Sequence, residues 1–254
     1  HNTATQTANN FAEAGALLLA PKNRGIVPLY KVYLHKHKGE GQELWLVQKY
    51  YECGTVAKFA QARKGLPEPV AASIFHDLVS ALGALHSVGL VHRDVKGSNA
   101  MLSMLPEPHA ALTDFGCAIS HEGHSLRRMV GSVFWMSPEV LRKDPYGTSA
   151  DIWSVGVTLY ELLAGRVPDG KQRLRAMLNQ CLVGVPPPTS ASPAAQRALN
   201  DCLAIDVRKR ATATDLLRSS FVSGTADRAK LKIALNDYLR FKALSEAMGV
   251  ESAL

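Results

Sequence analysis

The sequence predicts an α+β fold in which a short strand-rich region precedes a largely helical remainder. Residues 26–34 and 44–50 are rich in β-branched and aromatic residues and flank a Lys/Gly-rich turn, which predicts a pair of strands. Residues 69–87 repeat apolar side chains at helical spacing, and residues 151–164 are apolar on nearly all faces. Helices therefore follow the strands, and the second of these is expected to lie in the core.

This core helix has candidate boundaries, and another helix is expected near the end of the chain. Ser149 is a candidate N-cap and Gly165 a candidate C-cap of the core helix. Residues 226–248 have the pattern of an amphipathic helix. Its apolar face consists of Leu231, Leu235, Tyr238, Leu239 and Leu244. Packing of this face on the rest of the chain is favoured over docking to a partner.

The most informative stretch is His92-Arg93-Asp94-Val95-Lys96-Gly97-Ser98-Asn99, followed fifteen residues later by Asp114-Phe115-Gly116. An Asp and an Asn five residues apart on a polar loop are often only turn formers that bond their own backbone. Two such motifs in this order, with strand-like residues between them, make that explanation much weaker. We therefore interpret both motifs as parts of one catalytic site.

Together the two motifs resemble the catalytic core of the eukaryotic-type protein kinase family, and Lys96, two residues after Asp94, is typical of its serine/threonine type. The resemblance implies a mainly helical large lobe, a small-lobe β-sheet, and magnesium-assisted transfer of the terminal phosphate of ATP to a protein hydroxyl. Asp94 would accept the hydroxyl proton, and Lys96 would lie beside the terminal phosphate. Asn99 and Asp114 would bind the metal through hard oxygen ligands.

Later segments resemble further parts of that family. Residues 131–139, Gly-Ser-Val-Phe-Trp-Met-Ser-Pro-Glu, resemble the end of an activation segment and are closest in wording to the sterile-type group that contains the mitogen-activated kinase kinase kinases. The resemblance implies that Asp151 accepts hydrogen bonds from catalytic-loop amides, because a buried carboxylate needs partners. It also implies an ion pair between Glu139 and Arg210. A solvated Asp in a first helical turn and two unrelated surface charges are the respective alternatives.

Serine residues of the activation segment are candidates for controlling the site. Ser132 is expected to bond the catalytic aspartate and lysine, as the family's residue at that position does. Arg93, beside the catalytic aspartate, is a candidate partner for a phosphate that an upstream kinase adds to Ser120 or Ser125. An unmodified, solvated loop is an equal alternative for these two serines.

The resemblance also covers a nucleotide pocket. Residues 49–54 would form the hinge, in which the backbone of Lys49, Tyr50 and Tyr51 would meet adenine, and Met101 would form the floor below it. Lys49 departs from the acidic residue more usual at its position. Backbone contacts to adenine would survive that change.

The N-terminal region resembles the family less closely. A regulatory helix is expected over residues 10–20 with Glu13 as its acidic residue, and an ordinary exposed helix charge is an equal alternative. No Gly-x-Gly-x-x-Gly run and no Val-Ala-x-Lys strand precede Ala12. The small-lobe sheet is therefore expected to be truncated, with an uncovered edge. Two hypotheses follow. One is a catalytic kinase region, and the other is a non-catalytic kinase-like interaction module or a fragment that lacks the phosphate-binding loop and its lysine.

We expect a partial small lobe over residues 1–50, a large lobe over 51–225 and a terminal helix over 226–254. The 254 residues are 46% hydrophobic, enough for a sizeable core. The formal net charge of +7 arises from scattered Lys and Arg, so an ordinary basic surface is favoured over nucleic-acid binding. The four cysteines lack metal-ligand or disulfide spacing, and no apolar run of membrane-spanning length is apparent. ATP, a protein substrate and an upstream kinase are the expected partners, in the cytoplasm.

Overall fold

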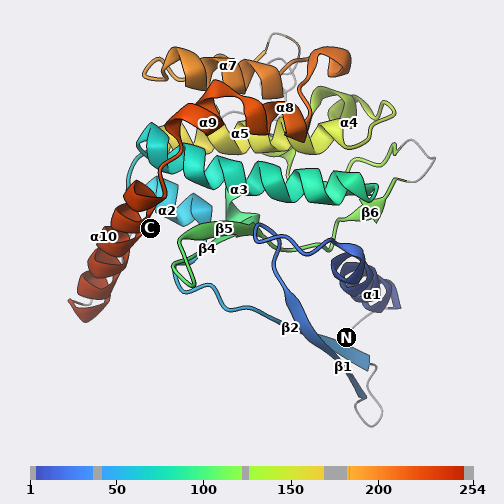
Figure 1. The fold of residues 1–254 in the computed structure, drawn as a ribbon. Coiled ribbons are helices and arrows are strands. Elements are labelled where there is room, and N and C mark those ends of the chain that lie inside the picture. The colour runs from blue at the N-terminus through green and yellow to red at the C-terminus, as the bar shows by residue number, and fades with distance from the viewer. Residues whose placement is uncertain (1–3, 37–41, 122–125, 169–181, 183, 249–254) are drawn as a thin grey trace.

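The computed structural model describes residues 4–36, 42–121, 126–168, 182 and 184–248. Figure 1 shows a helical body from which the β1–β2 hairpin projects at one end, so the fold is α+β with a reduced small lobe. The helices are α1 (Ala4–Leu19), α2 (Val56–Ala62), α3 (Glu68–Ser87), α4 (Pro138–Arg142), α5 (Ser149–Ala164), α7 (Pro193–Cys202), α8 (Ala213–Arg218), α9 (Ser220–Thr225) and α10 (Arg228–Ala247). The strands are β1 (Leu29–Lys36), β2 (Gln42–Gln48), β3 (Leu90–Val91), β4 (Ala100–Ser103), β5 (His109–Leu112) and β6 (Ile119–Ser120). Short 3₁₀ turns are η1 (Gly97–Asn99), η2 (Val133–Trp135) and η3 (Val207–Lys209).

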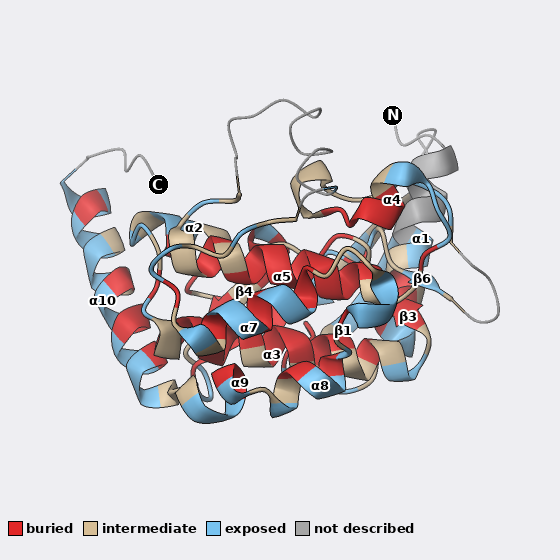
Figure 2. Cartoon of the chain, turned by 90° about the horizontal axis from the view of Figure 1, so that it is seen from above, coloured by how far each residue is buried: buried red, intermediate tan, exposed pale blue. Residues whose placement is uncertain are grey.

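The core lies between α3 and α5, which are mainly red, and so buried, in Figure 2. Phe75 of α3 and Trp153 of α5 are among the largest fully buried side chains. Helices α2, α7, α8 and α9 contact this pair and cover its apolar faces. The all-round apolar pattern of α5 is therefore explained by burial on all sides.

Helix α3 has the length and hydropathy of a membrane-spanning segment, contrary to the sequence-based expectation that no such run is present. Of its apolar window, 67% is buried inside the protein. No second helix in the described ranges meets the same criteria. Its apolar composition is accounted for by its place at the centre of the fold.

The predicted C-cap of α5 is confirmed, and its predicted N-cap is wrong. Gly165 caps the helix with φ +68°, in the left-handed region that glycine adopts readily. Ser149 is not the N-cap but the first helical residue, and Thr148 precedes it in a helical conformation without a side-chain cap. The backbone carbonyl of Ser149 accepts a hydrogen bond from Arg210 Nη1 at 2.9 Å. The Ala150 and Asp151 N–H groups donate to the carbonyls of Gly147 and Thr148, both at 3.1 Å, so a backbone turn takes the place of the expected side-chain cap.

Strands β1 and β2 pair antiparallel, with Leu29 opposite Gln48. The sequence predicted that the first strand starts at Ile26, but Pro28 has no N–H for a sheet ladder, and β1 begins after it. Ile26 forms an isolated parallel bridge with Leu112 of β5 instead. Several large apolar side chains of the hairpin are exposed, namely Tyr30, Val32, Tyr33, Leu34, Trp45 and Val47. The hairpin has the uncovered surface expected of a truncated sheet.

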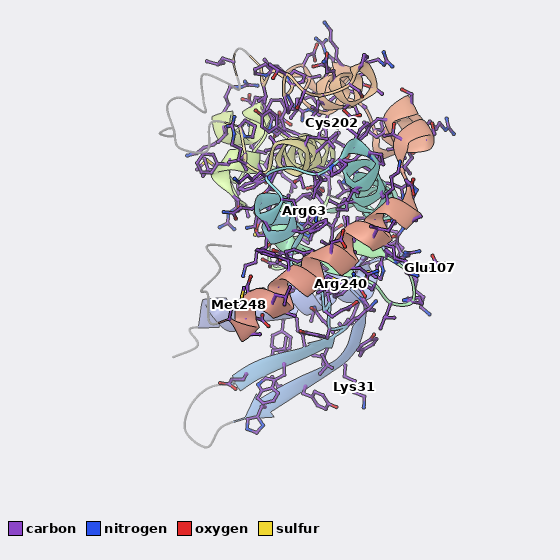
Figure 3. All side chains as sticks on the ribbon, turned by 90° about the vertical axis from the view of Figure 1, so that its left-hand side faces the viewer. Lys31, Arg63, Glu107, Cys202, Arg240 and Met248 are labelled. Carbon is purple, nitrogen blue, oxygen red and sulfur yellow. The ribbon has the colours of Figure 1, made fainter. Side chains whose placement is uncertain are left out.

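Helix α10 packs back on the body, as the sequence favoured. Leu231 and Leu235 are fully buried, and the Tyr238 ring meets Phe59 of α2 edge-on, with 5.2 Å between the ring centroids. Leu244, predicted on the same face, is 61% exposed, because the end of the helix extends past the body. Figure 3 shows α10 crossing that side of the molecule, with Arg240 and Met248 labelled along it.

Candidate active site

A buried carboxylate on α5 shapes the loop that contains the first catalytic motif. Asp151 Oδ2 accepts a hydrogen bond from the His92 N–H at 2.8 Å, and Oδ1 accepts one from the Arg93 N–H at 2.8 Å. His86 Nε2 lies 3.0 Å from Oδ2. Burial disfavours the charge of Asp151, but hydrogen bonds from His86 and the His92 amide lower its pKa. The predicted contact between Asp151 and the loop amides is confirmed, and the solvated alternative is wrong.

The loop brings Asp94 and Lys96 together. Lys96 Nζ donates to Asp94 Oδ2 at 2.7 Å and to Ser132 Oγ at 2.7 Å, which confirms the predicted contact between Ser132 and the lysine. Asn99 Nδ2 donates to Asp94 Oδ2 at 2.9 Å. Burial opposes the charge of Asp94, yet these polar neighbours lower its pKa. Asp94 is therefore a carboxylate at neutral pH.

One oxygen of this cluster has no partner. Asp94 Oδ1 is buried and makes no hydrogen bond within the described part of the chain. Buried polar atoms of folded proteins are almost always hydrogen-bonded, so an unpaired one needs an explanation. A carboxylate oxygen can only accept, and an incoming hydroxyl group is a donor that would satisfy it.

Asn99 and Asp114 lie at the same end of the paired strands β4 and β5. The Thr113 N–H donates to the Asn99 carbonyl at 2.8 Å, which holds the two motifs together. Because the Asn99 amide nitrogen donates to Asp94, its side-chain oxygen is left as an acceptor. Asp114 is exposed and has φ +60°. An amide oxygen and a carboxylate are ligands that Mg²⁺ prefers, so this pair fits that ion.

Glu13 of α1 lies beside the Asp-Phe-Gly motif. Burial and the neighbouring Asp114 carboxylate raise its pKa, and the Phe115 N–H opposes them. No cation in the part of the chain that the structure describes is among the groups that shift this pKa. Phe115, the central residue of the motif, meets the His92 ring edge-on, with 4.8 Å between the ring centroids. The structure places Glu13 next to the site, and no lysine of the described ranges pairs with it.

The activation segment passes close to Arg93. Gly131 has φ +107°, and a Cβ at this position would collide with the Arg93 carbonyl oxygen, so glycine is required. Arg93 Nε donates to the Cys117 carbonyl at 2.6 Å. Ser120 is exposed on β6, whereas Ser125 lies outside the described residues. Binding of a phosphate by Arg93 stays a prediction.

The predicted ion pair between Glu139 and Arg210 is confirmed. Arg210 Nη1 lies 2.6 Å from Glu139 Oε1, and Nη2 lies 3.0 Å from Oε2, a bidentate geometry. The two side chains are 0% and 3% exposed. The Arg210 guanidinium also stands over the Trp153 ring, 5.2 Å from its centroid. The pair joins the Ser-Pro-Glu motif to α5, and the surface-charge alternative is wrong.

The hinge runs along β4. The Cys53 N–H donates to the Leu102 carbonyl at 3.2 Å, and Met101, also on β4, is partly buried. The side chain of Tyr50 is 83% exposed. Backbone contacts of the hinge to adenine, and Met101 as a floor below it, stay predictions.

The other two hinge side chains are turned away from the catalytic motifs. Lys49 Nζ donates to the carbonyl of Leu105, in the β4–β5 turn, at 2.7 Å. Tyr51 is 3% exposed, and burial raises the pKa of its hydroxyl to about 12. Only the backbone of these residues is therefore available to a nucleotide, as the sequence predicted for Lys49.

Glu161 of α5 contacts the catalytic loop and was missed from the sequence. Its Oε2 accepts a hydrogen bond from the Gly97 N–H at 3.3 Å, and a Cβ at Gly97 would crowd the same oxygen. Burial raises the pKa of Glu161 to about 7, and the Gly97 N–H and Trp135 offset this only in part. The available signal was a second acidic residue, besides Asp151, in a helix that is mostly apolar.

Replacing Glu161 with glutamine is expected to remove a pH dependence of stability. The folded pKa of about 7 lies above the value of about 4.3 in unfolded chains, so the folded state binds this proton more tightly. The free energy of unfolding therefore falls as the pH rises from about 4 through 7. Glutamine keeps the acceptor for Gly97 without the charge, and Glu161→Gln should be about 1–3 kcal/mol more stable than the wild type at pH 8.

Urea unfolding at pH 5 and pH 8 measures this difference. The gain should be much smaller at pH 5, where the wild-type Glu161 is already protonated in the folded state. Glu246→Gln, on the exposed side of α10, is the matched control and should change neither value. A gain of equal size at both pH values would contradict a titrating Glu161.

Comparison with known proteins tests the family suggested by these motifs. The family model described as "Protein kinase domain" matches residues 2–222. The chain belongs to the protein kinase family. Its helical body with small antiparallel sheets corresponds to the large lobe of this fold, and the β1–β2 hairpin with α1 is a reduced small lobe.

The similar proteins are named serine/threonine-protein kinases, and several carry the name ste20. The serine/threonine-protein kinase ste20 of Aspergillus oryzae is 35% identical over 208 residues, 80% of this kinase domain and 24% of the relative. The STE20 kinase of Saccharomyces cerevisiae is 32% identical over 215 residues, 82% of this domain and 23% of the relative. The probable serine/threonine-protein kinase mkcE of Dictyostelium discoideum is 32% identical over 254 residues, 97% of this domain and 34% of the relative. The chain thus spans about a quarter to a third of the length of these relatives.

Proposed function

We propose that this kinase domain transfers the terminal phosphate of ATP to a serine or threonine hydroxyl of a protein substrate. The observation that carries the proposal is the buried, unpartnered Oδ1 of Asp94, in a carboxylate that Lys96 and Asn99 already hold in place through Oδ2. A site for a hydroxyl donor is thereby formed in advance of substrate. The sterile-20-type relatives are named serine/threonine kinases, which supports the same reaction class.

In this mechanism Asp94 accepts the proton of the substrate hydroxyl through Oδ1 as the oxygen attacks phosphorus. Its lowered pKa keeps it ionised before the reaction. Lys96, held between Asp94 and Ser132, provides a positive charge beside the transferred group. Asn99 and Asp114 supply oxygen ligands for magnesium, which when bound neutralises charge on the phosphates. Backbone groups of residues 49–51 bind adenine above Met101.

Regulation by an upstream kinase is part of the proposal. Arg93 uses Nε for the Cys117 carbonyl, and its terminal nitrogens are then suited to a phosphate on the activation segment. Ser120 is exposed at the start of that segment and could receive one. A phosphate there would fix the segment against the catalytic loop.

The second candidate is a non-catalytic kinase-like interaction module. In the family the phosphates are covered by a Gly-x-Gly-x-x-Gly run and held by a Val-Ala-x-Lys strand, and residues 1–254 contain neither motif. Glu13 is consistent with the interaction module, since its carboxylate lies near Asp114 with no offsetting cation in the described residues. The complete set of Asp94, Lys96, Asn99 and Asp114 favours the enzyme, because a scaffold does not need them.

Phosphate transfer from labelled ATP to a generic basic protein, with magnesium, separates the two candidates. Asp94→Asn is expected to lower the rate of the purified chain by at least about a hundredfold, because the general base is lost. The matched control is Asp237→Asn on the exposed face of α10, which should transfer at the wild-type rate. Background signal from all three folded proteins would overturn the enzyme proposal for this chain.

A further inference from the structure

A cavity of about 640 Å³ lies behind the hinge, apart from the catalytic motifs. It is formed where the end of α1 and the α1–β1 connection meet the β4–β5 turn, on which Glu107 is labelled in Figure 3. The residues that line the cavity do not include the catalytic residues or the predicted adenine floor, namely Asp94, Lys96, Asn99, Asp114 and Met101. Its volume is within the range of small-molecule sites in proteins.

The walls of the cavity are mostly apolar. Leu18, Val27, Leu29 and Pro106 contribute side chains to it. Val27 is 2% exposed and belongs to the core, whereas Leu18 is 72% exposed and lies at the mouth. A ligand that fills this space must therefore have an apolar body.

The charged side chains that line the cavity are Lys22, Arg24 and Lys49, and no carboxylate lines it within the described part of the chain. Arg24 is already neutralised, because its Nη1 lies 3.1 Å from the Glu107 carboxylate just outside. Glu52 does not line the cavity; it accepts hydrogen bonds from Ser103 and Met104, and its charge favours the charged form of Lys49 from outside the cavity. Lys22 and Lys49 are left as the cations that face the space.

Lys49 has one N–H to offer a ligand. Its Nζ donates to the Leu105 carbonyl at 2.7 Å and lies 3.4 Å from His109 Nε2. His109 Nδ1 lies 2.7 Å from the Glu107 carbonyl, which can only accept, so Nδ1 carries the proton and Nε2 accepts from Lys49. An ammonium group has three donors, and these two hydrogen-bond acceptors use two of them. The Tyr51 ring, which also lines the cavity, lies 5.0 Å from Nζ at its centroid and provides no oxygen or nitrogen acceptor there.

We propose that this rear cavity binds a small amphipathic carboxylic acid, with its apolar chain against the walls and its carboxylate on Lys49. Lys49 is half-buried and has one free ammonium donor, which suits a ligand with a single negative charge. A doubly charged phosphate would need more donors. The position that usually carries an acidic hinge residue in this family is therefore the head-group contact of a separate ligand site. The site does not depend on the phosphoryl transfer proposed above.

Calorimetric titration of the purified chain with dodecanoate, below its micelle concentration, tests the site. Saturable binding of one equivalent is expected, and Lys49→Met should weaken it on the order of tenfold, because a charge-assisted hydrogen bond is lost. Leu18→Trp should weaken it as well by filling the mouth at an exposed position. Lys58→Met, an exposed lysine on α2, is the matched control and should bind as the wild type does.

Dodecyltrimethylammonium, which has the same tail and the opposite charge, should not bind with comparable affinity. Thermal unfolding of each variant establishes that it is folded before titration. The proposal would be overturned if wild type and Lys49→Met bound dodecanoate with equal affinity. It would also be overturned if the wild type bound dodecanoate and dodecyltrimethylammonium equally well. In either case the lysine charge would not contribute to binding. No binding of dodecanoate to folded wild-type protein would overturn it as well.

Discussion

Arg210→Ala is expected to lower the free energy of unfolding by about 3–5 kcal/mol, because it leaves the Glu139 carboxylate buried without its cation. The native pair is bidentate and almost wholly removed from water, so the loss is not repaired by solvent. The same guanidinium donates to the Ser149 carbonyl and stacks on Trp153, and these contacts are lost together with the ion pair.

Urea unfolding of the purified chain measures this loss. Arg208→Ala is the matched control, since the Arg208 side chain is 90% exposed and its bridge to Asp206 lies on the surface, and its unfolding midpoint should stay close to that of the wild type. A double variant, Glu139→Leu with Arg210→Met, should recover part of the loss because it buries no unpaired charge. If Arg210→Ala and Arg208→Ala unfolded at the same midpoint, the pair would not be a structural anchor.

Asp151→Asn is expected to lower the free energy of unfolding by about 3–5 kcal/mol, because the change removes a fully buried, charged hydrogen-bond acceptor from two backbone amides. An asparagine oxygen can accept from one of the His92 and Arg93 N–H groups, but its NH₂ then faces the other. The interaction with His86 is weakened at the same time. The catalytic loop, which these amides belong to, should loosen first.

The pH dependence of this effect has a definite sign. The pKa of Asp151 is lower in the folded state than the value of about 3.9 in unfolded chains. The contribution of Asp151 to the free energy of unfolding is therefore complete above about pH 4 and is lost as the pH falls through the folded pKa. The difference between wild type and Asp151→Asn should be largest near neutral pH and should shrink in acid; a difference that grew in acid would contradict a stabilising carboxylate.

Hydrogen exchange of the His92 and Arg93 amides tests the local part of this prediction. Both amides should exchange faster in Asp151→Asn than in the wild type, because each has lost a charged acceptor. Asp144→Asn is a suitable control, since Asp144 is half-exposed and lies outside this network. Faster exchange in both variants would point to general destabilisation rather than to the loop.

Residues whose role follows from a motif or from local turn chemistry could be predicted from the sequence. Motifs of fixed spacing located Asp94, Lys96 and Ser132, and in the structure the Lys96 ammonium donates hydrogen bonds to the other two side chains. Local turn chemistry located Gly165, whose positive φ depends on its own residue type. Ser149 was misjudged because the first N–H groups of the helix donate to the carbonyls of Gly147 and Thr148, so that no side-chain cap is used.

The sequence determined the fold class, the order of strands and helices and the catalytic motifs, because periodicity and spacing are properties of neighbouring residues. The tertiary structure alone decided that Glu161 lies against Gly97 and that Lys49 points behind the hinge into the rear cavity. It also decided that Glu13 faces Asp114 without a lysine partner among the described residues. These placements depend on packing between segments far apart in the chain, and local sequence patterns carry no information about burial or charge at such contacts.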